Sequence, residues 1–229
     1  MPYLLTPGPL TTSRGVKFAM LADWGSWDQE LKFIVADIRR RLLRLAACDD
    51  NYTCVLMQGS GSFAIEAALG SFATIGRRKM LMISNGAYGE RAIQIIERLN
   101  RPHEVLRYAD HEKPKLADVE ALLDADPGIS SVFLVHCETT SGLINPMRDI
   151  VAAVKKRERS IILDAMSSFG AIPIDTAALG IDVLISSTNK CIEGVPGFAF
   201  VLCRWDLLKA SKDRCHSLAL DLHDQWRYM

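Results

Sequence analysis

A lysine stands where an apolar strand should already have ended. Residues 185–201 read ISSTNKCIEGVPGFAFV, so that Lys190 follows a short run of polar residues. A loop that contains Gly194, Pro196 and Gly197 comes next, and a second apolar run follows that loop. The glycines and the proline make this loop rigid and keep it next to Lys190. The lysine amine therefore lies at the edge of the expected sheet, where it can bond to a carbonyl compound. Lys190 is therefore our first candidate catalytic residue.

A carboxylate, Asp164, stands near the end of a second apolar run, IILDAM (residues 161–166). Burial raises the pKa of a carboxyl group at such a position and costs stability, and a cationic partner offsets that cost. Lys190 stands at the end of a neighbouring strand, at the same edge of the expected sheet. The two residues form either a structural ion pair or a functional pair.

A glycine-rich turn, QGSGSFAIEAAL (residues 58–69), follows a third apolar run and opens a helix. Free N–H groups at the helix start, together with Ser60, Gly61 and Ser62, suit one compact phosphate group. The spacing G-x-G-x-x-A also fits the dinucleotide-binding fingerprint, but the next strand ends in Ser-Asn and offers no carboxylate for a ribose. A P-loop is excluded because no Gly-Lys-Ser/Thr occurs. An ordinary turn with a serine N-cap is the remaining alternative.

A phosphate-binding turn, an acid and a lysine at one sheet edge supply what pyridoxal phosphate requires. The lysine bonds to the cofactor aldehyde, Asp164 keeps the pyridine nitrogen protonated, and the helix start holds the phosphate. Once the substrate amine has displaced it, Lys190 serves as the base and acid that moves a proton. Tyr88 could stack on the ring or be a core aromatic, and Thr140 could donate a hydrogen bond to the ring oxygen. We therefore expect pyridoxal phosphate as the cofactor.

Apolar runs of strand length alternate along the chain with stretches of helical period. The runs predict strands at residues 53–57, 79–84, 103–108, 132–137, 161–166, 182–186 and 198–203, and the stretches predict helices at 63–72, 90–99, 116–125 and 147–156, after a helical lead-in at 17–47. This alternation predicts an α/β fold with a mostly parallel seven-stranded sheet and helices on both faces. The short Gly-Pro loop before the last strand predicts that one strand runs antiparallel. Because ligands bind beyond the carboxyl ends of parallel strands, the candidate residues should form a single site.

Composition excludes several classes of protein. The chain has 229 residues, of which 49% are hydrophobic and 24% charged, and its formal net charge is zero. No basic field is available to attract nucleic acid or a membrane surface, and no apolar run approaches the ~18 residues of a spanning helix. The N-terminus shows no secretory signal. Six scattered cysteines with neither a Cys-x-x-Cys pair nor a zinc-type spacing predict a cytoplasmic protein without a metal site.

A set of motifs spread over residues 5–229 carries a family resemblance. In chain order they are TPGPLT, QGSGSFAIEAALG, NGAYGER, HCETTSG, DAMSSFGAIPID and TNKCIEGVPGFAFV. Together they resemble the class V aminotransferases of the type I pyridoxal phosphate fold. The resemblance implies the following roles: Lys190 bonds to the cofactor, Asp164 pairs with the pyridine nitrogen, Ser60, Gly61 and Ser62 bind the phosphate, Tyr88 stacks on the ring, Thr140 lies near the ring oxygen, and Met166 packs beneath the ring.

Further segments narrow the reaction that this resemblance implies. The stretches DWGSWD (residues 23–28) and CHSLALDLHDQWRYM (residues 215–229) are similar to those of family members that move the amino group of 2-aminoethylphosphonate to pyruvate, giving phosphonoacetaldehyde and alanine in phosphonate catabolism. Transaminases for alanine and glyoxylate, or for serine and pyruvate, share every cofactor residue and are the alternative. The resemblance also leads us to expect a homodimer.

The resemblance also implies a domain organisation. We expect an N-terminal segment at residues 1–16, followed by a large cofactor-binding domain at residues 17–229. Family members continue into a smaller C-terminal domain, which carries the arginine for a substrate carboxylate and a hydroxyl that reaches the neighbouring subunit's cofactor. We expect this chain to lack that domain. A folded remnant without catalytic activity is therefore a further alternative.

Overall fold

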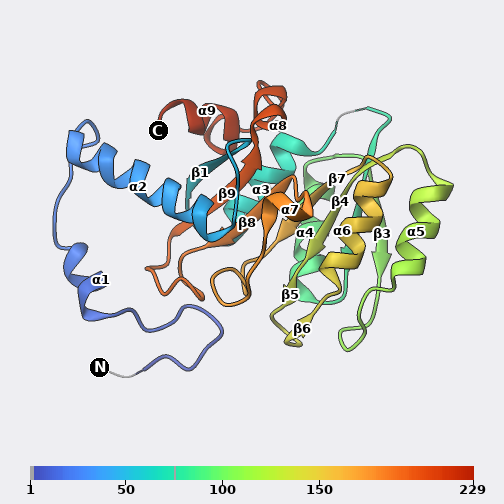
Figure 1. Ribbon diagram of the computed structural model, residues 1–229, viewed down its shortest axis with the longest axis horizontal. Helices are drawn as coiled ribbons and strands as arrows, with labels where there is room; N and C mark the ends of the chain where they lie inside the picture. Colours follow the sequence, from blue (N-terminus) through green and yellow to red (C-terminus); the bar gives the residue numbers. More distant parts are fainter. Residues whose placement is uncertain (1–2, 75) are drawn as a thin grey trace.

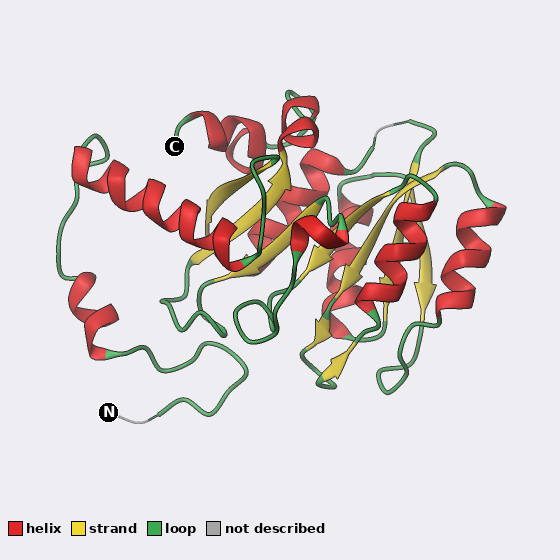
Figure 2. Cartoon of the chain, viewed as in Figure 1, coloured by secondary structure: helices red, strands yellow, loops and turns green. Residues whose placement is uncertain are grey.

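A seven-stranded sheet forms the centre of the molecule. The computed structural model describes residues 3–74 and 76–229, so the first two residues of the expected N-terminal segment lie outside the described part. The strands are ordered β1-β9-β8-β7-β4-β2-β3 and form the yellow layer between the helices in Figure 2. They are β1 (Tyr52–Gln58), β2 (Lys79–Ser84), β3 (His103–Arg107), β4 (Ile129–Val135), β7 (Ser160–Asp164), β8 (Val183–Ser187) and β9 (Phe198–Arg204). The predicted seven-stranded sheet is confirmed.

The strand directions place most carboxyl ends at one edge of the sheet. Neighbouring strands from β3 through β2, β4 and β7 to β8 pair in parallel. Within the described part of the chain, β9 is the strand of this sheet that points the opposite way from the rest, because it pairs antiparallel with both β8 and β1. Strand β1 therefore points the same way as β8. The mostly parallel sheet and the single reversed strand agree with the sequence predictions.

Helices cover both faces of the sheet (Figure 1). They are α1 (Arg14–Ala19), α2 (Gln29–Leu45), α3 (Gly61–Phe72), α4 (Ala87–Arg98), α5 (Leu116–Ala125), α6 (Met147–Lys156), α7 (Thr176–Leu179), α8 (Trp205–Ala210) and α9 (Leu222–Arg227), with a 3₁₀ turn, η1 (Leu218–Leu220). One apolar cluster joins α2, α5 and α6 to the sheet, and a second joins α3, α4, α8 and α9 to the other face. No helix within residues 3–74 and 76–229 has the length and apolarity needed to cross a membrane.

The second half of strand β4, residues 132–135, shows why a buried strand reads as a continuous apolar run. Val132 and Leu134 belong to the cluster on one face, whereas Phe133 and Val135 belong to the cluster on the other. Successive side chains of a strand point to opposite faces, so a strand buried on both sides has no polar alternation. The sheet is therefore a rigid platform for the loops at its carboxyl edge.

Two predicted elements differ from the observed ones. The lead-in at residues 17–47 is not one helix, because Gly25 donates its N–H to the Asp28 carboxylate at 2.7 Å and closes a turn between α1 and α2. The strand predicted at residues 132–137 ends at Val135. Beyond it the chain forms a separate hairpin, in which β5 (Cys137–Glu138) pairs with β6 (Leu143–Ile144).

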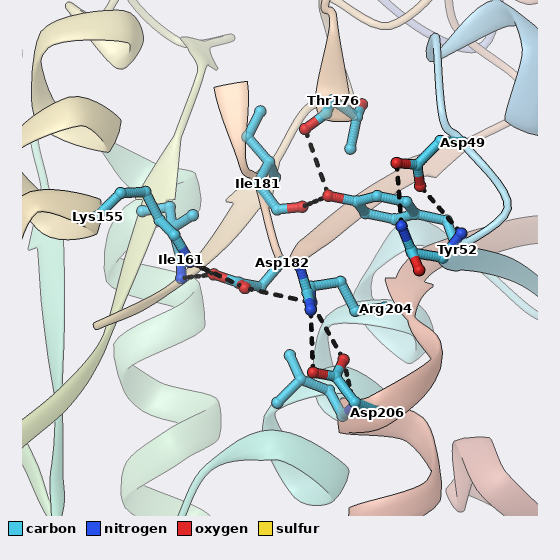
Figure 3. A network of polar contacts seen from close by, with 11 residues as sticks. Asp49, Tyr52, Lys155, Ile161, Thr176, Ile181, Asp182, Arg204 and Asp206 are labelled. Carbon is cyan, nitrogen blue, oxygen red and sulfur yellow. Dashed lines mark hydrogen bonds and ion pairs between the residues drawn. The ribbon is translucent and has the colours of Figure 1, made fainter. Parts of the chain in front are cut away.

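A polar network fastens the opposite, amino-terminal edge of the sheet (Figure 3). Asp182, which precedes β8 and is 4% exposed, accepts hydrogen bonds from the Lys155 ammonium at 2.8 Å and from the Ile161 N–H at 2.8 Å. The Arg204 guanidinium lies 3.9 Å from the same carboxylate. These contacts connect α6, β7, β8 and β9 far from the carboxyl edge.

Candidate active site

A cavity of about 340 Å³ opens at the carboxyl edge of the sheet. Its lining includes seven of the eight predicted site residues, Ser60, Gly61, Ser62, Tyr88, Asp164, Met166 and Lys190, together with Gly8, Arg91 and Asn189. Hollows of about 640 and 510 Å³ lie beside α1 and α2, but none of the predicted residues lines either of them. The strand ends therefore bring the candidate residues to one place, as the parallel topology requires.

Asp164, the last residue of β7, presents a buried carboxylate to this cavity. Its Oδ1 accepts the N–H of Met166 at 2.9 Å, and no hydrogen bond within the described part of the chain reaches Oδ2. Burial raises the pKa of Asp164 to about 6, although the Met166 N–H and the Lys190 charge act in the opposite direction. Among the described residues, Asp164 takes part in no ion pair, so a direct Asp164–Lys190 salt bridge is not the arrangement found.

Lys190 is half-buried and faces two hydroxyl groups. Its Nζ donates to Ser167 Oγ at 2.9 Å and to Thr139 Oγ1 at 3.3 Å, and these two hydroxyls also contact each other. Burial lowers the pKa of the Lys190 ammonium, while Asp164 is the largest of the charges that raise it. A lowered pKa increases the fraction of neutral amine, which is the nucleophilic form.

The glycine-rich turn begins α3 beside Met166. Ser60 is the N-cap residue, with an extended backbone, and its hydroxyl makes no capping hydrogen bond. Gly59 has φ +104°, a left-handed conformation that lets the chain turn sharply from β1 into the helix. A Cβ on Gly61 would lie 2.7 Å from Met166 Sδ, so a larger residue there would displace the end of the Met166 side chain. The helix start therefore lines the cavity with a serine hydroxyl that caps no N–H group of α3.

Tyr88 and Thr140 have different places in the structure. The Tyr88 ring centroid lies 5.0 Å from Lys190 Nζ, and the side chain is 39% exposed on the cavity wall. Thr140 is exposed and donates its hydroxyl to the Glu138 carboxylate at 2.9 Å. Tyr88 thus lines the cavity and its stacking on a ring stays a prediction, whereas Thr140 is not among the residues that line the cavity. Its contact with a ring oxygen stays a prediction.

The N-terminal segment contributes a wall that the sequence did not predict. Gly8 lines the cavity, and a Cβ on it would lie 2.7 Å from Lys190 Cγ. Leu10 donates its N–H to the Asn189 carbonyl at 3.1 Å, which holds the segment against the lysine loop. The motif TPGPLT, with two prolines around one glycine, was the available signal for a rigid, closely packed segment.

Two polar residues beside the lysine were also missed from the sequence. Ser167 and Thr139 lie within the motifs DAMSSFG and HCETTSG, each one or more residues beyond a strand end. Their position after apolar runs was the only local signal, because hydroxyl residues are common in loops of every kind. Their pairing with Lys190 depends on three separate strands and could be seen only in the folded chain.

Comparison with known proteins identifies close relatives of the chain. Residues 23–215 match the family model described as aminotransferase class-V. The chain is 52% identical over 229 residues to a 2-aminoethylphosphonate–pyruvate transaminase of Rhizobium meliloti (strain 1021), covering 100% of this chain and 60% of that protein. It is 51% identical over 227 residues to a protein of the same name from Vibrio vulnificus (strain CMCP6), covering 99% of this chain and 62% of that protein. The chain thus spans about three-fifths of the length of these relatives.

Solved structures share the fold. The alanine–glyoxylate aminotransferase of a Nostoc species superimposes with a TM-score of 0.91 at 22% identity, covering 100% of this chain and 61% of that one. The ureidoglycine–glyoxylate aminotransferase of Bacillus subtilis gives a TM-score of 0.90 at 24% identity, covering 97% and 58%. These likenesses support the fold, and the family match extends over most of the sequence that forms the cavity. The chain belongs to the class-V aminotransferase family.

Proposed function

We propose that this chain is the cofactor-binding part of a pyridoxal phosphate-dependent transaminase that moves the amino group of 2-aminoethylphosphonate to pyruvate. One observation carries the proposal: Asp164, a buried residue whose Oδ2 meets no donor among the described residues, lines the same cavity as Lys190. The substrate pair is supported by the names of relatives that are about half identical to this chain.

The residues present fit pyridoxal phosphate. Asp164 would accept a hydrogen bond from the protonated pyridine nitrogen, which would provide the donor that Oδ2 lacks in the described chain. Ser60, Ser62 and the start of α3 would hold the phosphate group. Tyr88 and Met166 would contact the ring. When bound, the cofactor supplies an electron sink that makes the Cα–H bond of the amino donor acidic.

The protein's own groups account for proton transfer. Burial keeps a larger part of Lys190 neutral than in water, so its Nζ can accept a proton from the substrate carbon and return it. The hydroxyls of Ser167 and Thr139 orient the amine from one side. Asp164 is ionised above about pH 6 and stabilises positive charge at the position it faces.

We also propose that the protein is a cytoplasmic homodimer whose partners are small-molecule substrates. The family resemblance and the six scattered cysteines without a Cys-x-x-Cys pair support this assignment. The expected division at residues 16 and 17 stays a prediction, and α1 (Arg14–Ala19) spans that position. Sedimentation equilibrium would test the dimer directly.

An assay of alanine formation tests the proposed reaction. Purified protein with pyridoxal phosphate, 2-aminoethylphosphonate and pyruvate should form alanine and phosphonoacetaldehyde in equal amounts, and Lys190→Ala should form neither. Alanine with glyoxylate, and serine with pyruvate, are the comparison pairs. Faster turnover of either comparison pair would overturn the substrate assignment. Turnover of no pair would favour a cofactor-binding chain without catalysis.

A further inference from the structure

Glu138 is a fully buried carboxylate that contacts the backbone of Tyr88, a residue of the cavity wall, and none of the assigned roles uses it. It is 0% exposed and belongs to β5, the short strand beyond the end of β4. No basic side chain in the described part of the chain lies within ion-pair distance of it. A buried charge without a cationic partner requires several hydrogen-bond donors. The structure supplies them from two segments.

Both carboxylate oxygens of Glu138 accept hydrogen bonds. Oε2 accepts the N–H groups of Tyr88 at 3.2 Å and Gly89 at 3.3 Å. Oε1 accepts the Thr140 hydroxyl at 2.9 Å and the Thr140 N–H at 3.3 Å. The side chain therefore connects the first turn of α4 to the loop of the β5–β6 hairpin.

The contact with α4 replaces a missing cap. The N-cap residue of this helix is Gly86, which has no side chain to accept the first N–H groups, although α4 has twelve residues. Glu138 accepts two of these N–H groups from outside the helix, and its negative charge suits the positive end of the helix dipole. A Cβ on Gly86 would lie 2.3 Å from Glu138 Cγ. The φ of Gly86 is 165°, an extended backbone that any residue can adopt. The close approach of Glu138, and not the backbone conformation, is therefore what favours glycine at this position.

The cap by Glu138 fixes the backbone of Tyr88, whose side chain lies on the cavity wall. The residue whose N–H contacts Glu138 also carries the ring that lies 5.0 Å from Lys190 Nζ. We propose that Glu138 is a positioning residue, which fixes the backbone of Tyr88 and thereby holds the tyrosine ring against the cofactor and Lys190. The cap itself is independent of the proposed function, whereas its effect on the cofactor rests on that function.

Amide hydrogen exchange tests the cap without any cofactor. In Glu138→Gln, which keeps the size of the side chain but not its charge, the N–H groups of Tyr88 and Gly89 should exchange about tenfold faster. Gly86→Ala, which pushes the unchanged carboxylate away, should have the same effect. Gly15→Ala is the control, because its added Cβ meets nothing closer than 3.8 Å. Unchanged exchange at Tyr88 and Gly89 in both variants would overturn the proposal.

A double-mutant cycle tests whether the effect passes through Tyr88. Glu138→Gln should weaken pyridoxal phosphate binding about tenfold in the parent, but less than about twofold in a Tyr88→Ala background. Circular dichroism and thermal unfolding monitor folding, and Gly86→Ala replaces Glu138→Gln if that variant does not fold. Equal losses of affinity in both backgrounds would mean that Glu138 does not act through Tyr88. If the parent binds no pyridoxal phosphate, the proposed function fails, while the exchange measurement still decides the cap.

Discussion

At the residue scale, the surroundings of Lys190 lower the pKa of its amine and orient it. Ser167 Oγ accepts from Nζ at 2.9 Å, whereas Thr139 Oγ1 lies farther away, at 3.3 Å. Ser167→Ala should leave the amine free to rotate, so its reaction with added pyridoxal phosphate should slow about threefold to tenfold. Rapid-mixing absorbance measurements at fixed pH would show this effect.

A matched control separates this effect from the loss of any serine. The hydroxyl of Ser130 donates to the Lys79 carbonyl at 3.3 Å near the start of β4, at the end of the sheet away from the cavity. Ser130→Ala removes this hydroxyl. That variant should react with pyridoxal phosphate at the parent rate. Equal rates for Ser167→Ala and the parent would show that the hydroxyl does not orient Lys190.

Asp164 makes the stability of the cofactor-free protein depend on pH. Its folded-state pKa of about 6 lies above the ordinary value of 3.8, so the folded state binds the proton more tightly than the unfolded state. The contribution of Asp164 to the unfolding free energy is therefore fully present below about pH 4. This contribution is lost as the pH rises through about 6. The charged, buried carboxylate then costs about 3 kcal/mol of folding free energy above pH 6.

Asp164→Asn should remove most of this cost. Without cofactor, the variant should exceed the parent in unfolding free energy by about 2 kcal/mol at pH 8, and the difference should vanish near pH 4. Urea titrations at several pH values measure it. A variant that is less stable than the parent at pH 8 would contradict the buried, donor-poor environment described for Oδ2.

At the element scale, the edge of the sheet opposite the cavity is held by the Asp182 network (Figure 3). Asp182→Asn keeps the shape of the side chain but removes the charge that faces Lys155 Nζ at 2.8 Å. The loss of charge-assisted hydrogen bonds at a buried site should lower the unfolding free energy by about 1.5–3 kcal/mol. Cofactor affinity should stay near that of the parent, because the network is remote from the cavity.

Asp206 provides the comparison for Asp182. It pairs with Arg204 at 3.1 Å, but its side chain is 64% exposed. Asp206→Asn should therefore change the unfolding free energy by less than about 1 kcal/mol. If both variants had equally small effects in thermal unfolding, the Asp182 network would not be what holds this edge of the sheet.

At the scale of the whole molecule, the first residues of the chain meet a loop nearly two hundred positions later. Gly8→Ala would place a Cβ 2.7 Å from Lys190 Cγ, so the lysine or the N-terminal segment must move. We expect weaker pyridoxal phosphate binding, by about threefold to tenfold, with unchanged thermal stability. Gly15→Ala should not weaken binding, because its added Cβ meets nothing closer than 3.8 Å. Fluorescence titration with pyridoxal phosphate would distinguish the two variants.

Features that depend on neighbouring residues in the sequence could be predicted, whereas features that depend on residues far apart in the chain could not. Residues 132–135 of strand β4 read directly from their apolar run, and the strand-end positions of Asp164 and Lys190 follow from the parallel topology. The burial of Glu138 could not be read from HCETTSG, because its donors come partly from α4, fifty residues earlier. The close approach of Gly8 to Lys190 could not be predicted either, because the two residues are far apart in the sequence. Local pattern predicts elements, whereas these contacts exist only after the elements have packed.

The central claim is that Lys190 is the amine that holds the cofactor. Sodium borohydride reduction of the protein after incubation with pyridoxal phosphate should fix the cofactor to that amine, and peptide mass spectrometry should find it on Lys190. The peptides that contain Lys155 and Lys209 are internal controls, since Lys155 contacts Asp182 and Lys209 lies over the Trp205 ring. We predict a label on Lys190 that disappears in Lys190→Ala. A label on another lysine, or an unchanged total in Lys190→Ala, would contradict the account.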